Sequence, residues 1–253
     1  MNSLSKRLLG LLTGKGWPPP EPEVHDKVFC IGIQRSGTTS TGDFCEQQLG
    51  MPRRGNILSR QLGWSRLWYE GKLDEVFADP MFRSGQMFDD GPWWFPGVYQ
   101  QLFEIFPQSK FVMFTREPTE WFRSLQAHSG GRSPGYTDVH ARVYGRDADY
   151  AALAAKAGGR LDPLHQNGLD LKGQEAHYTD HYQRHISSVQ NFFKQHDPKR
   201  VFMTELDDPQ KFRALAVYLG YPDHQYQEVR SSAILTRESA AIQTEETHPN
   251  GPS

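Results

Sequence analysis

The chain has 253 residues, a length that suits one domain with a sizeable hydrophobic core. Its 28 Lys and Arg residues and 30 Asp and Glu residues give a formal net charge of −2, which argues against nucleic acid as a partner because no global positive field would attract it. The two cysteines, Cys30 and Cys45, are too few for a disulfide-stapled fold and predict a reducing, cytoplasmic location.

Residues 1–26 precede the predicted domain. Residues 1–15 combine five leucines with three Lys and Arg residues, a basic amphipathic pattern without the apolar run and cleavage site of a signal peptide. We expect this segment to rest against the body of the protein, with weak contact to an anionic membrane surface as the alternative. Residues 17–22 (WPPPEP) predict a stiff linker. Since no apolar run reaches the length that a bilayer requires, we expect no transmembrane segment.

The most informative segment, VFCIGIQRSGTTS, predicts a buried strand over residues 27–34, a short glycine-containing turn and a helix over 39–49. This arrangement directs backbone N–H groups and the positive end of the helix dipole at one point, where an anion can bind. Gly32 and Gly37 have the spacing of the P-loop motif, but Thr38 stands at the position of its lysine. The segment therefore predicts phosphate or sulfate binding and argues against nucleoside-triphosphate hydrolysis.

The middle of the chain predicts a helix over 64–77, a short strand over 85–89 and a helix over 95–106. Asp89 and Asp90 stand where this strand ends. Two functions are open for these carboxylates. One of them can cap a helix that begins just after them, and one can accept a proton in a reaction.

A second strand–helix unit follows. The strand over 110–115 leads to Arg116, and the helix over 117–127 carries Ser124 about two turns along. Arg116 either pairs with an acidic residue in the first turn of this helix or binds an anion through charge-assisted hydrogen bonds. The region over 129–173 is polar, rich in glycine and expected to be irregular and partly helical.

Three further elements close the domain: a helix over 175–195, a strand over 200–204 and a helix over 210–220. Short apolar strands that alternate with helices predict one α/β domain, with a parallel β-sheet flanked by helices on both faces. Ligands of such folds bind at the carboxyl ends of the strands, so the cationic and acidic strand ends should share one edge. Residues 223–253 are expected to form a loosely packed C-terminal extension and tail.

The motif RSGTT after an apolar strand resembles the 5′-phosphosulfate-binding loop of sulfotransferases that use 3′-phosphoadenosine 5′-phosphosulfate (PAPS). The unit formed by strand, Arg116, helix and Ser124 is similar to the part of those enzymes that holds the 3′-phosphate of the nucleotide. The resemblance spans about residues 27–222 and implies a sulfotransferase domain with a P-loop NTPase-like fold. The donor-binding residues that it implies are Arg35, Ser36, Gly37, Thr38, Thr39, Ser40, Arg116 and Ser124.

The resemblance also implies the chemistry. Cytosolic sulfotransferases use a histidine, and several carbohydrate sulfotransferases a glutamate, as the base that takes the proton of the acceptor hydroxyl. Here Asp90 stands in that place, with Asp89 as the second candidate, and Arg35 would neutralise charge on the leaving phosphate. PAPS is then the co-substrate, and no metal is required. We expect a small-molecule, carbohydrate or lipid-linked acceptor, in a site that the region over 129–173 helps to shape.

Two alternatives to a sulfotransferase remain open: a P-loop kinase of small molecules, and a non-catalytic nucleotide-binding protein of the same fold. Trp93 and Trp94 either face a sugar ring or pack in the core. His177, His181 and His185 recur at helical spacing, for which a solvated helix face is favoured over a metal site.

Overall fold

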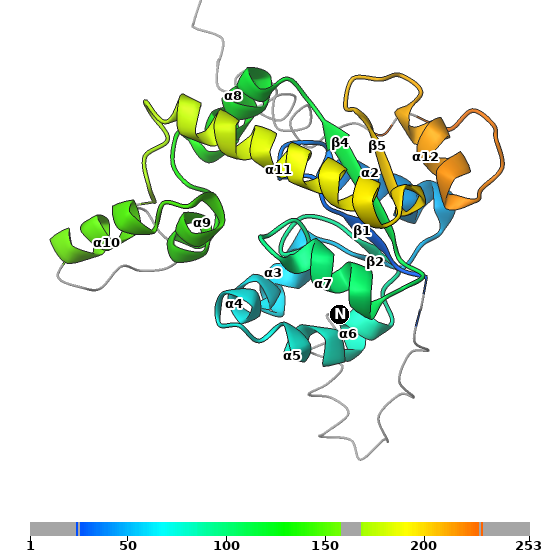
Figure 1. Ribbon diagram of the computed structural model, residues 1–253, viewed down its shortest axis with the longest axis horizontal. Coiled ribbons are helices and arrows are strands. Elements are labelled where there is room, and N and C mark those ends of the chain that lie inside the picture. The colour runs from blue at the N-terminus through cyan, green and yellow to red at the C-terminus, as the bar shows by residue number, and fades with distance from the viewer. Residues whose placement is uncertain (1–23, 25, 158–167, 228, 230–253) are drawn as a thin grey trace, which may run out of the picture.

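The computed structural model describes residues 24, 26–157, 168–227 and 229. Within them, five parallel strands form one sheet in the order β2-β3-β1-β4-β5 (Figure 1). The strands are β1 (Val28–Cys30), β2 (Arg53–Arg54), β3 (Met87–Phe88), β4 (Lys110–Thr115) and β5 (Val201–Glu205). The predicted parallel α/β fold is confirmed. The segments over 1–15 and 17–22 and most of the extension over 223–253 lie outside the described residues.

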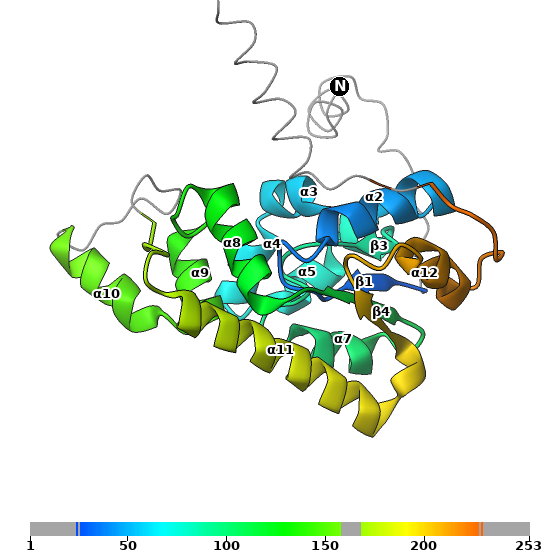
Figure 2. The same ribbon diagram turned by 90° about the horizontal axis from the view of Figure 1, so that it is seen from above.

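Helices cover both faces of the sheet (Figures 1 and 2). One face carries α7 (Val98–Ile105), α8 (Pro118–Ser129) and α11 (Glu175–His196). The other face carries α2 (Thr38–Leu49) and α12 (Lys211–Leu219). The arrangement follows from short apolar strands that are buried on both sides.

The central strand β1 shows how one strand serves both layers. Phe29 points into the larger core with α7 and α11, whereas Val28 and Cys30 point into the smaller core with α2 and α12. Side chains alternate because successive residues of a strand face opposite sides of the sheet. The Cys30 and Cys45 thiols are free and buried, and burial raises the pKa of Cys30 to about 12.

The other helical segments lie around this three-layered body, and α9 and α10 project from it on the side of α4 (Figures 1 and 2). They are α3 (Asn56–Gln61), α4 (Trp64–Tyr69), α5 (Leu73–Ala78), α6 (Pro80–Arg83), α9 (Thr137–Tyr144), α10 (Asp147–Lys156) and the 3-10 helix η1 (Pro198–Arg200).

Three regions differ from the sequence-based expectation. The helix predicted over 64–77 is divided into α4 and α5, because Gly71 takes a left-handed φ of +75° and the Lys72 N–H donates back to the Leu67 carbonyl at 2.8 Å. The strand β2 and the helix α3 were not predicted, since two and six residues are too short for a periodic pattern. The first strand is also shorter than the predicted range 27–34, and the remaining residues form a loop.

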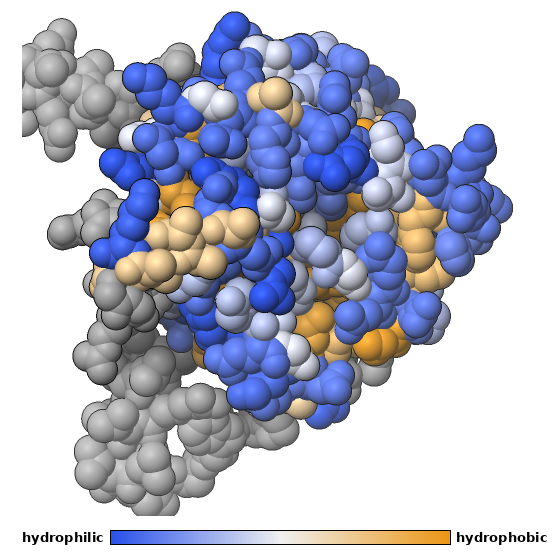
Figure 3. Space-filling model, turned by 60° about the vertical axis from the view of Figure 1, so that its left-hand side comes forward, coloured by the Kyte–Doolittle hydropathy of each residue, from blue (hydrophilic) through white to orange (hydrophobic). Residues whose placement is uncertain are grey.

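The side of the molecule that carries α9 and α10 is mostly hydrophilic, with small hydrophobic patches between the polar side chains (Figure 3). Exposed large hydrophobic side chains among the described residues are Ile57, Ile105 and Val217, which lie apart in the sequence. Single exposed hydrophobic residues are normal on soluble surfaces. In the part of the chain that the structure describes, no helix has the length and apolar character needed to cross a membrane.

Candidate functional site

The loop over residues 31–37 connects β1 to α2 through two residues in the left-handed region, Arg35 with φ +72° and Gly37 with φ +78°. A non-glycine residue in this region costs about 1–2 kcal/mol, so the conformation of Arg35 must be stabilised by its surroundings. The positive φ favours glycine at position 37, and a Cβ atom there would lie 2.4 Å from Cδ1 of Leu206, so that side chain would have to move. The loop is therefore a strained element in a tight space.

Side chains of α8 and α11 hold this loop. The Trp121 indole N–H donates to the Gln34 carbonyl at 2.9 Å. The Tyr182 hydroxyl lies 3.2 Å from Ser36 Oγ and accepts a hydrogen bond from the Arg116 backbone N–H at 3.0 Å. The Trp121 and Tyr182 rings stack with their centroids 4.4 Å apart. These contacts fix the loop relative to the carboxyl end of β4.

Two guanidinium groups meet at the loop. Arg35 Nε donates to Ser124 Oγ at 3.2 Å, and Arg116 Nη1 donates to the Arg35 carbonyl at 3.3 Å. Burial and the positive charge of Arg116 lower the pKa of Arg35. Within the described residues neither guanidinium forms an ion pair with a carboxylate. Two adjacent, partly buried cations in this arrangement are suited to binding a polyanion.

The acidic residues at the start of α8 have other partners than Arg116. Glu117 caps the helix by accepting a hydrogen bond from the Glu120 N–H at 2.8 Å. The Glu120 carboxylate pairs with Arg123. Hence the alternative in which Arg116 pairs with a carboxylate of this turn is wrong.

The hydroxyl residues of the motif differ in their access to a cavity of about 770 Å³. Thr38 and Thr39 line this cavity together with Arg35. Ser36, Thr38 and Ser40 are buried, with 1%, 4% and 4% of their surface exposed, and Thr39 is partly exposed. The structure thus brings the motif residues together, but it presents only some of their side chains to the cavity.

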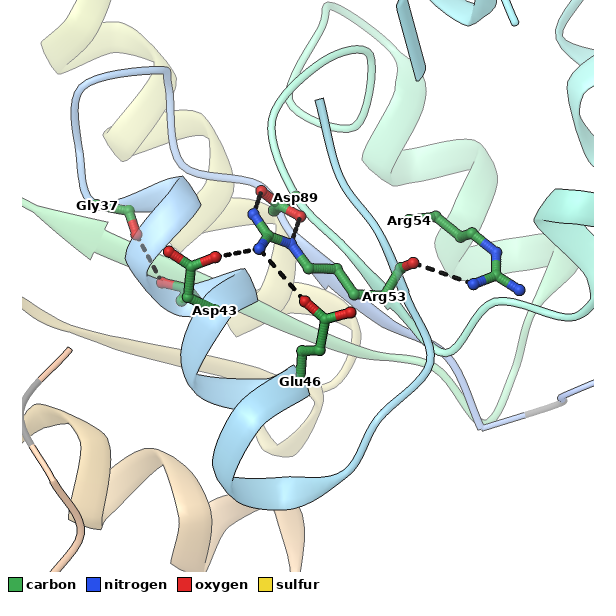
Figure 4. Close-up of polar contacts among 7 residues, drawn as sticks. Gly37, Asp43, Glu46, Arg53, Arg54 and Asp89 are labelled. Carbon is green, nitrogen blue, oxygen red and sulfur yellow. Dashed lines mark hydrogen bonds and ion pairs between the residues drawn. The ribbon is translucent and has the colours of Figure 1, made fainter. Parts of the chain in front are cut away.

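Asp89 and Asp90 follow β3 and have different surroundings. Asp89 is fully buried and accepts two hydrogen bonds from Arg53, Nε to Oδ1 and Nη2 to Oδ2, both 2.8 Å (Figure 4). Asp90 is partly exposed and lines the cavity. The next helix, α7, begins at Val98 with Gly97 as its N-cap, so neither aspartate is a helix cap. Of the two carboxylates, Asp90 is the one that a substrate can reach.

The environment of Asp90 tunes its carboxylate. The residue has a left-handed φ of +68°, a strained conformation of the kind found at functional sites. Burial and the negative charge of Asp89 raise the pKa of Asp90 to about 6. The Gly91 N–H, the nearby Trp94 indole and the charge of Arg35 act in the opposite direction. A carboxylate with a pKa near the working pH is suited to general-base catalysis.

The cavity extends from this carboxylate toward α3 and α9. Its lining includes Leu58 and Arg60 of α3 as well as Tyr136 and Val139 at the start of α9. The helix α9 belongs to the region over 129–173, which was expected to shape an acceptor site. Asp90 thus lies between the loop over residues 31–37 and a chamber with a mixed polar and apolar lining.

A family model of the sulfotransferase domain matches residues 27–227. The chain belongs to the sulfotransferase family. This match covers most of the chain.

Solved structures similar to this sulfotransferase include the sulfotransferase domain from the curacin biosynthetic pathway, with 13% identity and a TM-score of 0.44 over 83% of this chain and 81% of that one. The sulfotransferase from Alicyclobacillus acidocaldarius has 15% identity and a TM-score of 0.44 over 88% and 92% of the two chains. A gluconokinase from Sinorhizobium meliloti 1021 has 15% identity and a TM-score of 0.29 over 69% and 99%. No curated protein matches the sequence significantly.

Several residues of the sulfotransferase site carried no readable signal in the sequence. Tyr182 lies in the helix predicted over 175–195 and was not singled out, although its hydroxyl joins the loop to the end of β4. Arg53 was not singled out at all, because its partner Asp89 lies 36 residues away. Both residues act through contacts that only the tertiary structure creates.

The histidines of α11 do not form a solvated face. His185 Nε2 lies 2.8 Å from the Ile31 carbonyl, and His177 Nε2 lies 2.8 Å from the Tyr144 carbonyl. Burial, followed by the charge of His185, lowers the pKa of His181 to about 4. That expectation was wrong because α11 packs directly against the loop and α9. Within the described ranges, no group of His, Cys, Asp and Glu side chains could hold a metal ion.

The two tryptophans after Asp90 are both buried. Trp93 is fully enclosed and packs against the Phe29 and Trp64 rings in the larger core. Trp94 is 3% exposed and borders the cavity. Core packing is therefore the main role of Trp93, and only Trp94 is placed to touch a ligand.

Proposed function

We propose that this sulfotransferase transfers the sulfuryl group of PAPS to a hydroxyl group of a carbohydrate or lipid-linked acceptor. The acceptor oxygen bonds to sulfur while the bond between sulfur and the bridging phosphate oxygen breaks. The electron pair of that bond goes to the 5′-phosphate of 3′-phosphoadenosine 5′-phosphate (PAP), and the acceptor proton goes to Asp90. The products are a sulfate ester and PAP.

The contact between the two predicted halves of the donor site is the observation that carries this proposal. Arg35 of the loop touches Ser124 of α8, and Arg116 touches the loop backbone. A nucleotide with phosphate groups at both its 5′ and 3′ positions carries negative charge at two separate places. Such a nucleotide can pair with two cations, whereas a nucleotide charged at one end can pair with fewer. Loop N–H groups at the start of α2 would add donors to the 5′ side.

The roles of the site residues follow from their positions. Arg35 and the N-terminus of α2 stabilise the negative charge that develops on the leaving phosphate. Arg116 and Ser124 bind the 3′-phosphate. Asp90, with its pKa of about 6, is mostly ionised at neutral pH and can take the hydroxyl proton.

The cavity supports an acceptor that has several hydroxyl groups or a lipid portion. Asn56, Arg60 and Gln61 offer hydrogen bonds along its lining, while Leu58 and Val139 add apolar surface. A volume of about 770 Å³ is large enough for part of the donor and a sugar-sized acceptor.

The direct test is incubation of the protein with radiolabelled PAPS, without metal and with a chelator, against a panel of sugars, glycolipids and simple alcohols. We expect labelled sulfate on at least one acceptor and release of PAP. Phosphate transfer from ATP that depends on magnesium would instead identify a small-molecule kinase. Tight PAP binding without transfer to any acceptor would identify a non-catalytic nucleotide-binding protein.

A further inference from the structure

Arg53, the first residue of β2, is surrounded by three carboxylates (Figure 4). Its guanidinium group forms the bidentate pair with Asp89, hydrogen-bonds to Asp43 and lies 3.7 Å from Glu46. The Arg53 side chain is 14% exposed and that of Asp89 is 0% exposed. Asp43 and Glu46 belong to α2, the helix that begins at the donor loop. Arg53 therefore connects β2, to which it belongs, with α2 and with Asp89, the residue that follows β3.

The backbone closes tightly around this ion pair. A Cβ atom at Gly42 would lie 2.5 Å from Arg53 Nε and 2.6 Å from Asp89 Oδ1. A Cβ atom at Gly55 would lie 3.0 Å from each of the same two atoms. Glycines at both positions let α2 and the segment before α3 approach the pair, which leaves little space for another arrangement of the two side chains.

We propose that Arg53 is a positioning residue for sulfuryl transfer: its bidentate ion pair with Asp89 fixes the backbone from which Asp90 presents its carboxylate to the cavity. This inference rests on the proposed function, in which Asp90 accepts the acceptor proton. Asp89 and Asp90 share a peptide bond, so a fixed Asp89 restrains the strained φ of +68° at Asp90. A base held in one orientation keeps its oxygen within reach of the acceptor hydroxyl.

The ion pair also controls the charge next to Asp90. Among the residues that the structure describes, Asp90 interacts electrostatically with four titratable groups: Asp89, Arg35 in the loop, Cys30 in β1 and Tyr144 in α9. Burial raises the pKa of Cys30 and of Tyr144, so both are neutral at neutral pH. Asp89 and Arg35 are therefore the charged groups among these, and Arg53 compensates the charge of Asp89 through their ion pair.

The first test compares Arg53→Lys with Arg54→Lys. The two arginines are neighbours on β2, but Arg54 donates to the Met81 carbonyl and to Ser84 Oγ rather than to Asp89. In Arg53→Lys we expect kcat for transfer to fall by about tenfold to a hundredfold, with PAP binding within about twofold of the wild type because the donor loop stays in place. Arg54→Lys should keep its kcat. Equal kcat values in the two variants would overturn the proposal.

The second test uses Asp89→Asn and stays informative if Arg53→Lys fails to fold. Removal of the Asp89 charge lowers the pKa of Asp90, because that charge raises it in the wild type. The acidic limb of the kcat profile should then shift to lower pH, whereas a purely structural defect would reduce kcat at every pH equally. An unshifted limb would overturn the proposal.

The same shift can be measured without substrate, by carbon NMR titration of the side-chain carboxyl groups of the full chain. The Asp90 signal is assigned from its loss in Asp90→Asn. We expect its midpoint to be lower in Asp89→Asn than in the wild type, and equal midpoints would contradict the inference. Because this measurement needs no transfer, a wild-type protein that transfers nothing would count against the proposed function alone.

Discussion

The proposed donor and acceptor sides of this sulfotransferase are built in different ways. The loop proposed to bind the donor is short, is held by Trp121 and Tyr182 from two helices and is directly hydrogen-bonded by Arg116 at the end of β4. The cavity proposed to bind the acceptor has a wall that comes from α3, the turn after β3 and α9, which are far apart in the sequence. In the proposed function, a strained, heavily hydrogen-bonded loop specifies the donor, whereas the acceptor is selected by surfaces that meet only through packing.

The largest effect should come from the donor side. Arg35→Ala removes the cation beside the leaving phosphate, so kcat for transfer should fall by about 100- to 1,000-fold in an initial-rate assay with saturating PAPS. Arg123→Ala, a change at an exposed arginine paired with Glu120 on α8, is the matched control and should leave kcat unchanged. Loss of activity in both variants would show that transfer depends on the total positive charge of the protein and not on the position of Arg35.

Asp90 lies where the two sides meet. Asp90→Asn keeps the shape of the side chain but cannot accept the proton, so kcat should fall by about 100-fold or more while the affinity for PAP stays close to that of the wild type. The wild-type rate should fall as pH decreases through about 6, because protonation of Asp90 removes the base. The Asp90→Asn variant should not show this fall in rate at acidic pH. A fully active Asp90→Asn protein would move the base to another residue.

Gly37→Ala tests whether the strain of the loop matters for the donor side. The positive φ and the contact with Leu206 should together lower the free energy of unfolding by about 1–3 kcal/mol in urea titrations, and PAP affinity should fall with it. Gly130→Ala is the control, since Gly130 also has a positive φ of +61°, at the C-cap of α8, but a Cβ atom there would meet no other atom within 4 Å. It should destabilise the protein without weakening PAP binding.

The smallest effect should come from the acceptor side. Tyr136→Ala removes an aromatic ring from the cavity lining, so the KM for the acceptor should rise about threefold to tenfold, the effect of one aromatic contact. The KM for PAPS should not change. A rise in the KM for PAPS instead would mean that the two sides are not separate.

The two sides also differ in how much of them the sequence could predict. The strand over 110–115 coincides with β4, and the residues Arg35, Arg116 and Ser124 meet as the motifs predicted. This succeeds because a strand, a tight turn and a helix N-terminus are local structures with local signals. The motif residues then meet because parallel strands bring their carboxyl ends to one edge.

The choice between Asp89 and Asp90 shows where the sequence is insufficient. The two carboxylates are adjacent and chemically identical, and only the ion pair with Arg53, across 36 positions of sequence, shows which one is buried. Short elements such as β2 and α9 are likewise set by their tertiary contacts rather than by their own periodicity. The acceptor side consists mostly of such elements. The sequence therefore predicted only that the region over 129–173 contributes to it, and not which residues line the cavity.

Calorimetric titration of PAP and AMP into the wild type and into Arg116→Ala tests the central claim most directly, namely that the cations after β1 and β4 bind one bisphosphate nucleotide. We expect the wild type to bind PAP far more tightly than AMP, and Arg116→Ala to lose about 1.5–3 kcal/mol of this preference, the value of a hydrogen bond to a charged group. Equal affinities of the wild type for PAP and AMP would show that these two cations do not bind a bisphosphate nucleotide.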